Sequence, residues 1–278
     1  MFTKNDSPAL PAPIGALLAG WGQVASDPLL SEHTLLQLDR GRGRFFTGGD
    51  PVDAIVTMVE TSDRSTGLVE VAGASAAARQ RLWDAIRPGV VAIGAEHGLD
   101  PLVLLDRDGL ESVEPSVWSV VRMRIGCEAI EPVPTGERMT RDDVDDILSV
   151  INLAFEGHPE NGNWTKADLA DRMNQPWFDP DGFLVERNQL GVVAGFSWTK
   201  VHPDGVGEIY LLAVHPGLAG QGAGKDLVMR GLSYLCDEAK CTEVIVYSAG
   251  DNAIARGLYD SLGFTVDRVD HRVTIKQY

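Results

Sequence analysis

The sequence predicts an α/β protein with a mixed α+β sheet, built as two domains joined by a short linker. Its 278 residues exceed the roughly 100–200 residues of a typical domain. Each half carries a strand-like run followed directly by a helix-like run, from Leu68 and from Ile209. Between them EPVPTGE, at Glu131–Glu137, holds two prolines and a glycine and is typical of a linker. We therefore expect domains at 1–130 and 139–278, with a linker at 131–138.

The first half contains short strand-like segments and two helix-like segments. Ser31 is a suitable N-cap for a helix over 31–38. A helix from Ser75 is expected to stop at Ile86, because Pro88 lacks the N–H group and disfavours a helical residue before it. Runs rich in β-branched residues predict strands at 54–60, 67–72, 90–95, 103–105 and 117–125.

The second half alternates helices and strands in the order ααββ, β–loop–α, β–α–β. Thr140 and Thr165 are the expected N-caps of two amphipathic helices, the second ending near Asn174. Further helices are expected at 225–239 and 252–262. Strands are expected at 182–186, 192–201, 208–214 and 243–247, with a terminal hairpin over 264–275.

Composition excludes several classes of protein. The 24 basic and 40 acidic residues give a net charge of −16, which argues against binding to nucleic-acid phosphates or to an anionic membrane. No apolar run approaches about 20 residues, and no signal-peptide pattern opens the sequence. Three cysteines make no disulfide framework, and Cys236 and Cys241 are expected to be buried thiols rather than a metal pair. We expect a cytoplasmic monomer without a metal.

A glycine-rich turn, VHPGLAGQGAGK at 214–225, joins an apolar strand to a long helix. Its glycines let backbone N–H groups converge, and the helix N-terminus adds unpaired donors, so the pattern indicates an anion site. A Walker loop is excluded because Ala219 and Asp226 replace its first glycine and its hydroxyl. The G-x-G-x-G spacing also departs from the dinucleotide fingerprint. A glycine-rich connection without a ligand is the alternative.

The turn resembles the pyrophosphate loop of the GCN5-related N-acetyltransferases (GNAT), which bind acetyl-CoA after a strand ending in V-x-P. Gly222-Ala223-Gly224 match the glycines of Q/R-x-x-G-x-G/A, whereas Ala219 departs at its first position. A second stretch, DNAIARGLYDSLGF, is similar to the superfamily's N-x-x-A-x-x-x-Y-x-x-x-G-F helix. The matching residues are Asn252, Ala255, Tyr259, Gly263 and Phe264.

Three further stretches are similar to the mycothiol synthase family: FEGHPENGNW from Phe155, PWFDPDG from Pro176 and GFSWTKVHP from Gly195, together with GEIY from Gly207. That family has two tandem GNAT-like domains. It uses acetyl-CoA to acetylate the cysteinyl amine of cysteinyl-glucosaminyl-inositol, the last step of mycothiol biosynthesis. The resemblance covers about residues 140–278. In the first domain the loop at 72–79 has lost its glycine run, so a degenerate, structural domain that adds one wall to the substrate cleft is expected.

The resemblance also implies site residues. Acetyl-CoA contacts would fall on Leu212, Ala213, Val214, Ala219, Gly220, Gln221, Gly222, Ala223, Gly224, Lys225, Asn252, Ala253, Ile254, Ala255, Arg256 and Gly257. Contacts with the small-molecule amine would fall on Glu32, Glu160, Lys200, Glu208 and Tyr247.

Acetyl transfer to an amine needs a base for the ammonium, donors for the oxyanion and a proton for the departing thiolate. Glu208, which begins the strand before the turn, is the expected base, and Tyr259 is the expected acid. Backbone N–H groups near Val214 are expected to serve the thioester carbonyl. His158 and His215, each beside a proline, are expected to be structural.

Two other functions remain open. The protein could be a GNAT enzyme for another small amine or a protein N-terminus, or a non-catalytic acyl-CoA-binding module. The stretches around Glu160 and Lys200 favour the mycothiol substrate over another amine. The presence of both Glu208 and Tyr259 argues against a non-catalytic module.

Overall fold

The computed structural model describes residues 3–5, 18, 20–21, 29–39, 43–49, 51–60, 66–99, 102–106, 110, 118–156 and 163–275. The chain divides into two compact units, which we call unit 1 (Met1–Val120 with Asp270–Tyr278) and unit 2 (Val121–Val269). The predicted linker at 131–138 lies within unit 2. The division into domains at 1–130 and 139–278 therefore stays a prediction. In the described part of the chain, no helix is both long and apolar enough to cross a membrane.

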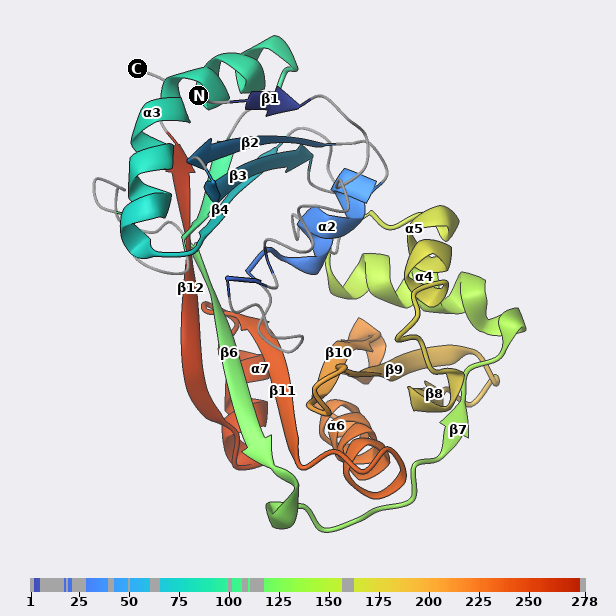
Figure 1. The fold of residues 1–278 in the computed structure, drawn as a ribbon. Coiled ribbons are helices and arrows are strands. Elements are labelled where there is room, and N and C mark those ends of the chain that lie inside the picture. Colours follow the sequence, from blue (N-terminus) through green and yellow to red (C-terminus); the bar gives the residue numbers. More distant parts are fainter. Residues whose placement is uncertain are drawn as a thin grey trace. The chain divides into compact units, whose positions relative to one another are not determined.

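Unit 1 is built on a mixed sheet with the strand order β1-β2-β3-β4-β5-β12, in which β4 and β5 run parallel (Figure 1). The helix capped by Ser31 is confirmed, since Ser31 Oγ accepts from Thr34 N at 3.2 Å. The elements of unit 1 that precede β12 are β1 (Thr3–Asn5), α2 (Glu32–Asp39), β2 (Gly43–Gly49), β3 (Val52–Glu60), β4 (Gly67–Gly73), α3 (Ala76–Glu96) and β5 (Leu102–Asp106).

Helix α3 continues through Pro88 to Glu96, so the predicted helix end at Ile86 and the predicted strand at 90–95 are wrong. The reason is an apolar stripe that repeats every four residues and is buried along its whole length. Packing of this stripe outweighs the roughly 3 kcal/mol that an internal proline costs a helix. The stripe consists of Ala78, Leu82, Ile86, Val90 and Gly94.

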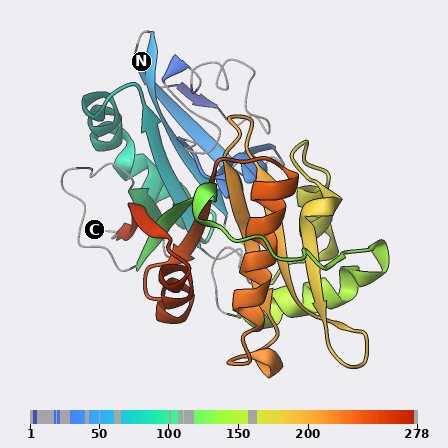
Figure 2. The same cartoon turned by 90° about the horizontal axis from the view of Figure 1, so that it is seen from below.

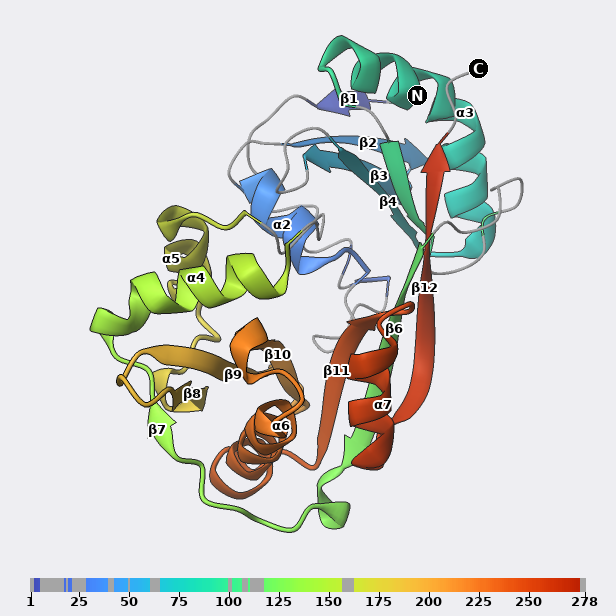
Figure 3. The same ribbon diagram turned by 180° about the vertical axis from the view of Figure 1, so that it is seen from behind.

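Unit 2 carries the strands β12-β6-β11-β10-β9-β8-β7 in that order. Figures 1 and 3 show α4 and α5 on one face of β8–β10 and α6 on the other, and Figure 2 shows α6 lying along these strands. The elements are β6 (Trp118–Gly126), η1 (Cys127–Ala129), β7 (Glu137–Arg138), η2 (Arg141–Asp143), α4 (Val144–Ala154), α5 (Lys166–Met173), η3 (Pro180–Gly182), β8 (Phe183–Arg187), β9 (Val193–Val201), β10 (Gly207–Val214), η4 (Pro216–Leu218), α6 (Ala223–Ser233), the π-helix η5 (Tyr234–Glu238), β11 (Glu243–Ala249), α7 (Ala253–Ser261) and β12 (Thr265–Ile275).

Two apolar cores lie on opposite faces of this sheet. The core on the α4 and α5 face includes Ile147, Phe196 and Trp198, whereas the core on the α6 face includes Ile209 and Leu232. The predicted N-caps are confirmed as capping boxes, Thr140 with Asp143 and Thr165 with Asp168.

The C-terminal segment is one continuous strand, β12, and the predicted hairpin over 264–275 is wrong. Its polar residues suggested a turn, but they bind the neighbouring strand instead. Asp267 accepts from Arg122 Nη2 at 2.8 Å and from Arg124 Nε at 2.7 Å, both on β6. These charged pairs let the strand continue where composition favoured a turn.

Cys127 and Cys236 form a disulfide, so the expectation that Cys236 is a buried thiol is wrong. The turn η1 after β6 and the π-helix η5 bring the two Cα atoms to 5.5 Å, although the cysteines are 109 positions apart in sequence. Such a pairing depends on tertiary contact, which sequence spacing does not contain. Cys241 is a buried free thiol, as expected.

Candidate active site

Strands β10 and β11 are paired in parallel only near their beginnings. The ladder joins Gly207 to Val244, Glu208 to Ile245 and Ile209 to Val246, although both strands continue further. In Figure 3 the two strands diverge beyond this point. The later residues of β10 are therefore not paired with β11. An extended ligand can form hydrogen bonds with their backbone groups along this edge.

A β-bulge lies where the strands part. The β10–β9 register pairs Ile209 with Thr199 and Leu211 with Trp198, which leaves Tyr210 as the extra residue. As a result, Tyr210 and Leu211 both pack on the α4 and α5 face. Bulges commonly re-aim groups beside active sites. This irregularity lies at Tyr210, earlier on the strand than Val214, where sequence reasoning had placed the carbonyl-binding N–H groups.

The glycine-rich turn leads from β10 through η4 into α6. Gly220 and Gly222 have φ values of +74° and +89°, which favour glycine. Gly222 is the N-cap of α6 and has no side-chain capping bond, so donors of the first turn remain for an external acceptor. A Cβ at either glycine would meet nothing within 4 Å. Backbone donors and open space are what a diphosphate requires.

The predicted acetyl-CoA residues lie on three consecutive features of unit 2. Leu212, Ala213 and Val214 end β10, and Ala219–Lys225 form the turn and the first residues of α6. Asn252 caps α7, where its Oδ1 accepts from Ala255 N at 3.0 Å. Arg256 Nη1 donates to Gly250 O at 3.1 Å. The remaining predicted residues, Ala253, Ile254, Ala255 and Gly257, lie in α7.

Glu208 lies on β10 and is only 7% exposed. Its Oε2 is 2.6 Å from Nε2 of His202, and its register partner on β9 is Lys200. Burial raises the pKa of Glu208, but the hydrogen bond from His202 and the charges of Lys200, His202 and Arg122 outweigh burial and leave this pKa lowered. The carboxylate is therefore ionised at neutral pH despite its burial.

Tyr259 lies on α7 and is 4% exposed, with its ring 5.4 Å from that of Phe264. It packs in the core on the α6 face, opposite the face that carries Lys200 and Glu208. Burial raises the pKa of its phenol, so the hydroxyl keeps its proton at neutral pH. Within the described residues this hydroxyl has no hydrogen-bond partner.

Lys200 lies beside an aromatic pair, with Nζ 4.7 Å from the Trp177 ring centre and 5.5 Å from that of Tyr210. Tyr210 accepts from Arg172 Nε of α5 at 3.1 Å. Tyr247 lies two residues beyond Ile245, the register partner of Glu208, and therefore on the same face. The structure thus brings Lys200, Glu208 and Tyr247 to one face of the sheet.

Two predicted substrate residues cannot be placed. Glu160 lies outside the described residues, as does His158. Glu32 begins α2 in unit 1, and its side chain lies outside the described part of the chain. Sequence reasoning missed His202, Tyr210 and Arg122. The signal for His202 was its place two residues after Lys200, one residue beyond the predicted strand 192–201, because alternate residues of an extended chain share a face.

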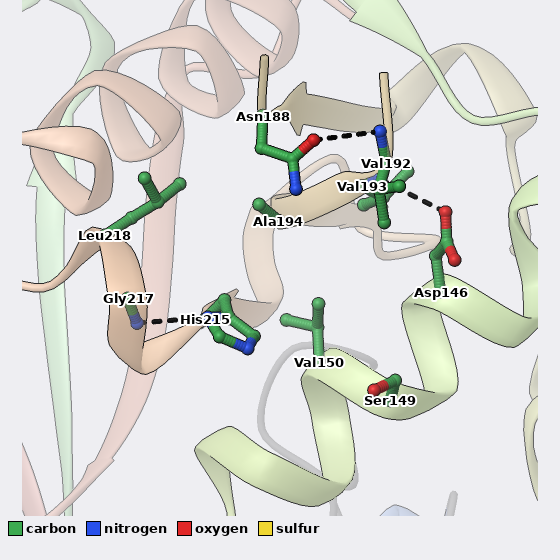
Figure 4. Close-up of a pocket in the computed structure, with 10 residues that line it drawn as sticks. All are labelled: Asp146, Ser149, Val150, Asn188, Val192, Val193, Ala194, His215, Gly217 and Leu218. Carbon is green, nitrogen blue, oxygen red and sulfur yellow. Dashed lines mark hydrogen bonds between the residues drawn. The ribbon is translucent and has the colours of Figure 1, made fainter. Parts of the chain in front are cut away.

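A cavity of about 290 Å³ lies beside the turn, between α4 and the start of β9 (Figure 4). It includes neither Glu208 nor Tyr259. His215 Nδ1 accepts from Gly217 N at 3.0 Å, which confirms the structural role expected of this histidine. The lining residues are Asp146, Ser149, Val150, Asn188, Val192, Val193, Ala194, His215, Gly217 and Leu218.

Comparison with solved structures supports the fold. A GNAT from Sphaerobacter thermophilus superposes with a TM-score of 0.63 at 17% identity, covering 99% of this chain and 96% of that chain. A tandem GNAT protein from the clavulanic acid pathway gives a TM-score of 0.68 at 13% identity, covering 99% and 98%. The predicted α/β fold of tandem GNAT-like domains is confirmed.

Sequence comparison identifies relatives. The model of the acetyltransferase (GNAT) family matches residues 146–264. A mycothiol acetyltransferase of Mycolicibacterium gilvum is 36% identical over 167 residues, covering 56% of this chain and 55% of that protein, so the match spans about half of that relative. Another, from Mycobacteroides abscessus, is 34% identical over 245 residues and covers 80% of both chains. By this similarity the chain belongs to the mycothiol acetyltransferase family within the GNAT acetyltransferases.

Proposed function

We propose that this protein transfers the acetyl group of acetyl-CoA to the cysteinyl amine of cysteinyl-glucosaminyl-inositol, the last step of mycothiol formation. The observation that carries the proposal is a buried carboxylate, Glu208, on the strand that parts from β11 and leads into the glycine-rich turn. Family membership supports the choice of substrate.

The residues present fit acetyl-CoA. The turn Ala219–Lys225 offers glycines with positive φ and the N-terminus of α6 to a diphosphate. Residues 212–214 of β10 lie on the edge beyond its pairing with β11, where the amides of the pantetheine arm can bond. The start of α7, Asn252–Gly257, flanks that arm in this proposal. Bound acetyl-CoA supplies the activated acetyl group.

In this proposal the thioester lies where the pairing of β10 and β11 ends, and Glu208 and Tyr259 approach it from opposite faces of the sheet. Glu208 takes one proton from the substrate ammonium, and the free amine attacks the acetyl carbonyl. The C–S bond breaks as the C–N bond forms. Tyr259 gives its proton to the thiolate and regains one as the nitrogen becomes an amide. The proton held by Glu208 leaves to solvent, which balances the reaction.

The amine substrate lies on the α4 and α5 face in this proposal. Glu208 attracts its ammonium before proton transfer. Lys200 and Tyr247 face the same side and hydrogen-bond sugar or inositol hydroxyls. Glu160 and Glu32 are proposed as further contacts on the basis of the family resemblance. A cytoplasmic location remains a prediction from composition, and a monomeric state also remains a prediction.

Incubation with acetyl-CoA and cysteinyl-glucosaminyl-inositol tests the proposal. We expect release of CoA thiol and an acetyl group on the cysteinyl nitrogen, located by mass spectrometry. Glucosaminyl-inositol, which lacks the cysteinyl group, is the matched control and should give no product. Turnover of another amine but not of the cysteinyl compound would support a different GNAT substrate. Tight acetyl-CoA binding without turnover of any amine would support a non-catalytic module.

A further inference from the structure

We propose that His202 is a positioning residue for the reaction: its Nε2–H holds Oε2 of Glu208 and leaves Oε1 as the oxygen that meets the substrate ammonium. This inference rests on the proposed function for its catalytic meaning, whereas the contact itself does not. His202 lies within the stretch GFSWTKVHP, but the sequence reasoning gave it no role.

The contact is short and enclosed. Nε2 of His202 and Oε2 of Glu208 are 2.6 Å apart, and the two residues are 6% and 7% exposed. An ionised carboxylate can only accept hydrogen bonds, so Nε2 must carry the proton. Within the described residues, Oε1 of Glu208 has no hydrogen-bond partner. One oxygen is thus held and the other remains available.

The β9–β10 hairpin holds the backbone of His202. His202 N donates to Val206 O at 2.9 Å, and Gly205 N donates to His202 O at 2.8 Å, which closes the β9–β10 hairpin. Pro203 follows directly and restricts the turn further. A donor fixed by the hairpin can hold Glu208 in one rotamer without reorganisation during the reaction.

The electrostatic surroundings give the hydrogen bond its importance. Without opposition, burial would raise the pKa of Glu208 and keep it protonated, unable to accept a proton. Three cations oppose this: His202 when protonated and Lys200, both from the β9 side, and Arg122 from β6. From β11 the register partner is the apolar Ile245, and from α5 Arg172 bonds to the hydroxyl of Tyr210. Of these groups only His202 hydrogen-bonds Glu208.

Two substitutions separate positioning from mere packing. His202→Gln keeps an N–H near the position of Nε2, whereas His202→Leu keeps the bulk and removes the donor. We expect the acid limb of the kcat/KM profile to move up by at least one pH unit in His202→Leu. Its loss of activity should reach tenfold or more at pH values below the acid limb of the wild type, and should shrink as pH rises because Glu208 ionises again. His202→Gln should recover most of this shift, and His97→Gln, at the exposed C-cap of α3, should change nothing.

A pH-independent loss of equal size in both His202 variants would show a structural role and overturn the proposal. Unchanged profiles in both variants would also overturn it. A second measurement, ¹⁵N NMR of the imidazoles, needs no substrate. We expect a proton on Nε2 of His202 in the wild type and a changed signal in Glu208→Gln. If the wild type acetylates no amine but shows this signal, the proposed function fails and the pairing stands.

Discussion

The ammonium of Lys200 lies 4.7 Å from the centre of the Trp177 ring, on the sheet face that also carries Glu208. The rings of Trp177 and Tyr210 hold the ammonium of Lys200 in place on the face that carries Glu208, the candidate base. Trp177→Leu should therefore raise KM for the amine by about three- to tenfold, as expected for a lost cation–π contact, with little change in kcat. Phe178→Leu is the matched control, because the neighbouring Phe178 ring meets Trp198 edge-to-face. An equal KM in both variants would show that Trp177 does not organise this face.

Gly222→Val should abolish tight binding of acetyl-CoA. The φ of +89° at Gly222 is strained for a β-branched residue, and the new methyl groups would stand where the diphosphate approaches the backbone. We expect the dissociation constant, measured by calorimetry, to rise at least tenfold, or about 1.4 kcal/mol. Gly98→Val, at another open glycine with φ +68°, is the control for strain alone. Unchanged affinity in Gly222→Val would refute the assignment of the turn.

Asp143 should make stability depend on pH. Hydrogen bonds from Arg187 lower the pKa of this carboxyl to about 2 against the opposing effect of burial, and Thr140 adds two more. Because this pKa is lower in the folded state, ionised Asp143 stabilises the protein at pH values above the unfolded-state pKa near 4. This stabilisation is lost as the pH falls towards 2. Asp143→Asn should remove about 1–2 kcal/mol of unfolding free energy at pH 6 and less at pH 3. Urea titrations check this, with the exposed Asp142→Asn as the control.

Reduction of the Cys127–Cys236 disulfide should destabilise the protein. The bond closes a loop across 109 positions, and constraining the unfolded chain in this way typically contributes about 2–4 kcal/mol. Thermal unfolding with and without a reductant measures the effect. Cys127→Ser should unfold at the lower temperature and should not respond to the reductant. A wild-type protein insensitive to the reductant would show that the bond adds no stability.

Local sequence patterns predicted what depends on neighbours along the chain. The capping boxes at Thr140 and Thr165, the turn after β10 and the helix beginning after Asn252 all follow from residues within a few positions of one another. Tertiary contacts decided the rest. Pro88 stays helical because Ile86 and Val90, on the apolar stripe of α3, are buried.

The candidate site shows the same division. Glu208 and Lys200 stood out from the sequence, and strand register places them opposite one another. The bulge at Tyr210, the hydrogen bond from His202 and the charge of Arg122 depend on three strands meeting. The geometry that controls the ionisation of Glu208 was therefore beyond the reach of the sequence patterns.

The rate of acetyl transfer by Glu208→Gln tests the central claim most directly. Gln keeps the size of the side chain but cannot take a proton, so kcat/KM for the cysteinyl amine at pH 7 should fall by about 10²–10⁴-fold. The dissociation constant of acetyl-CoA should stay within twofold, because the turn and α6 are untouched. A variant that binds acetyl-CoA and acetylates the amine at the wild-type rate would contradict the role of Glu208 as the base.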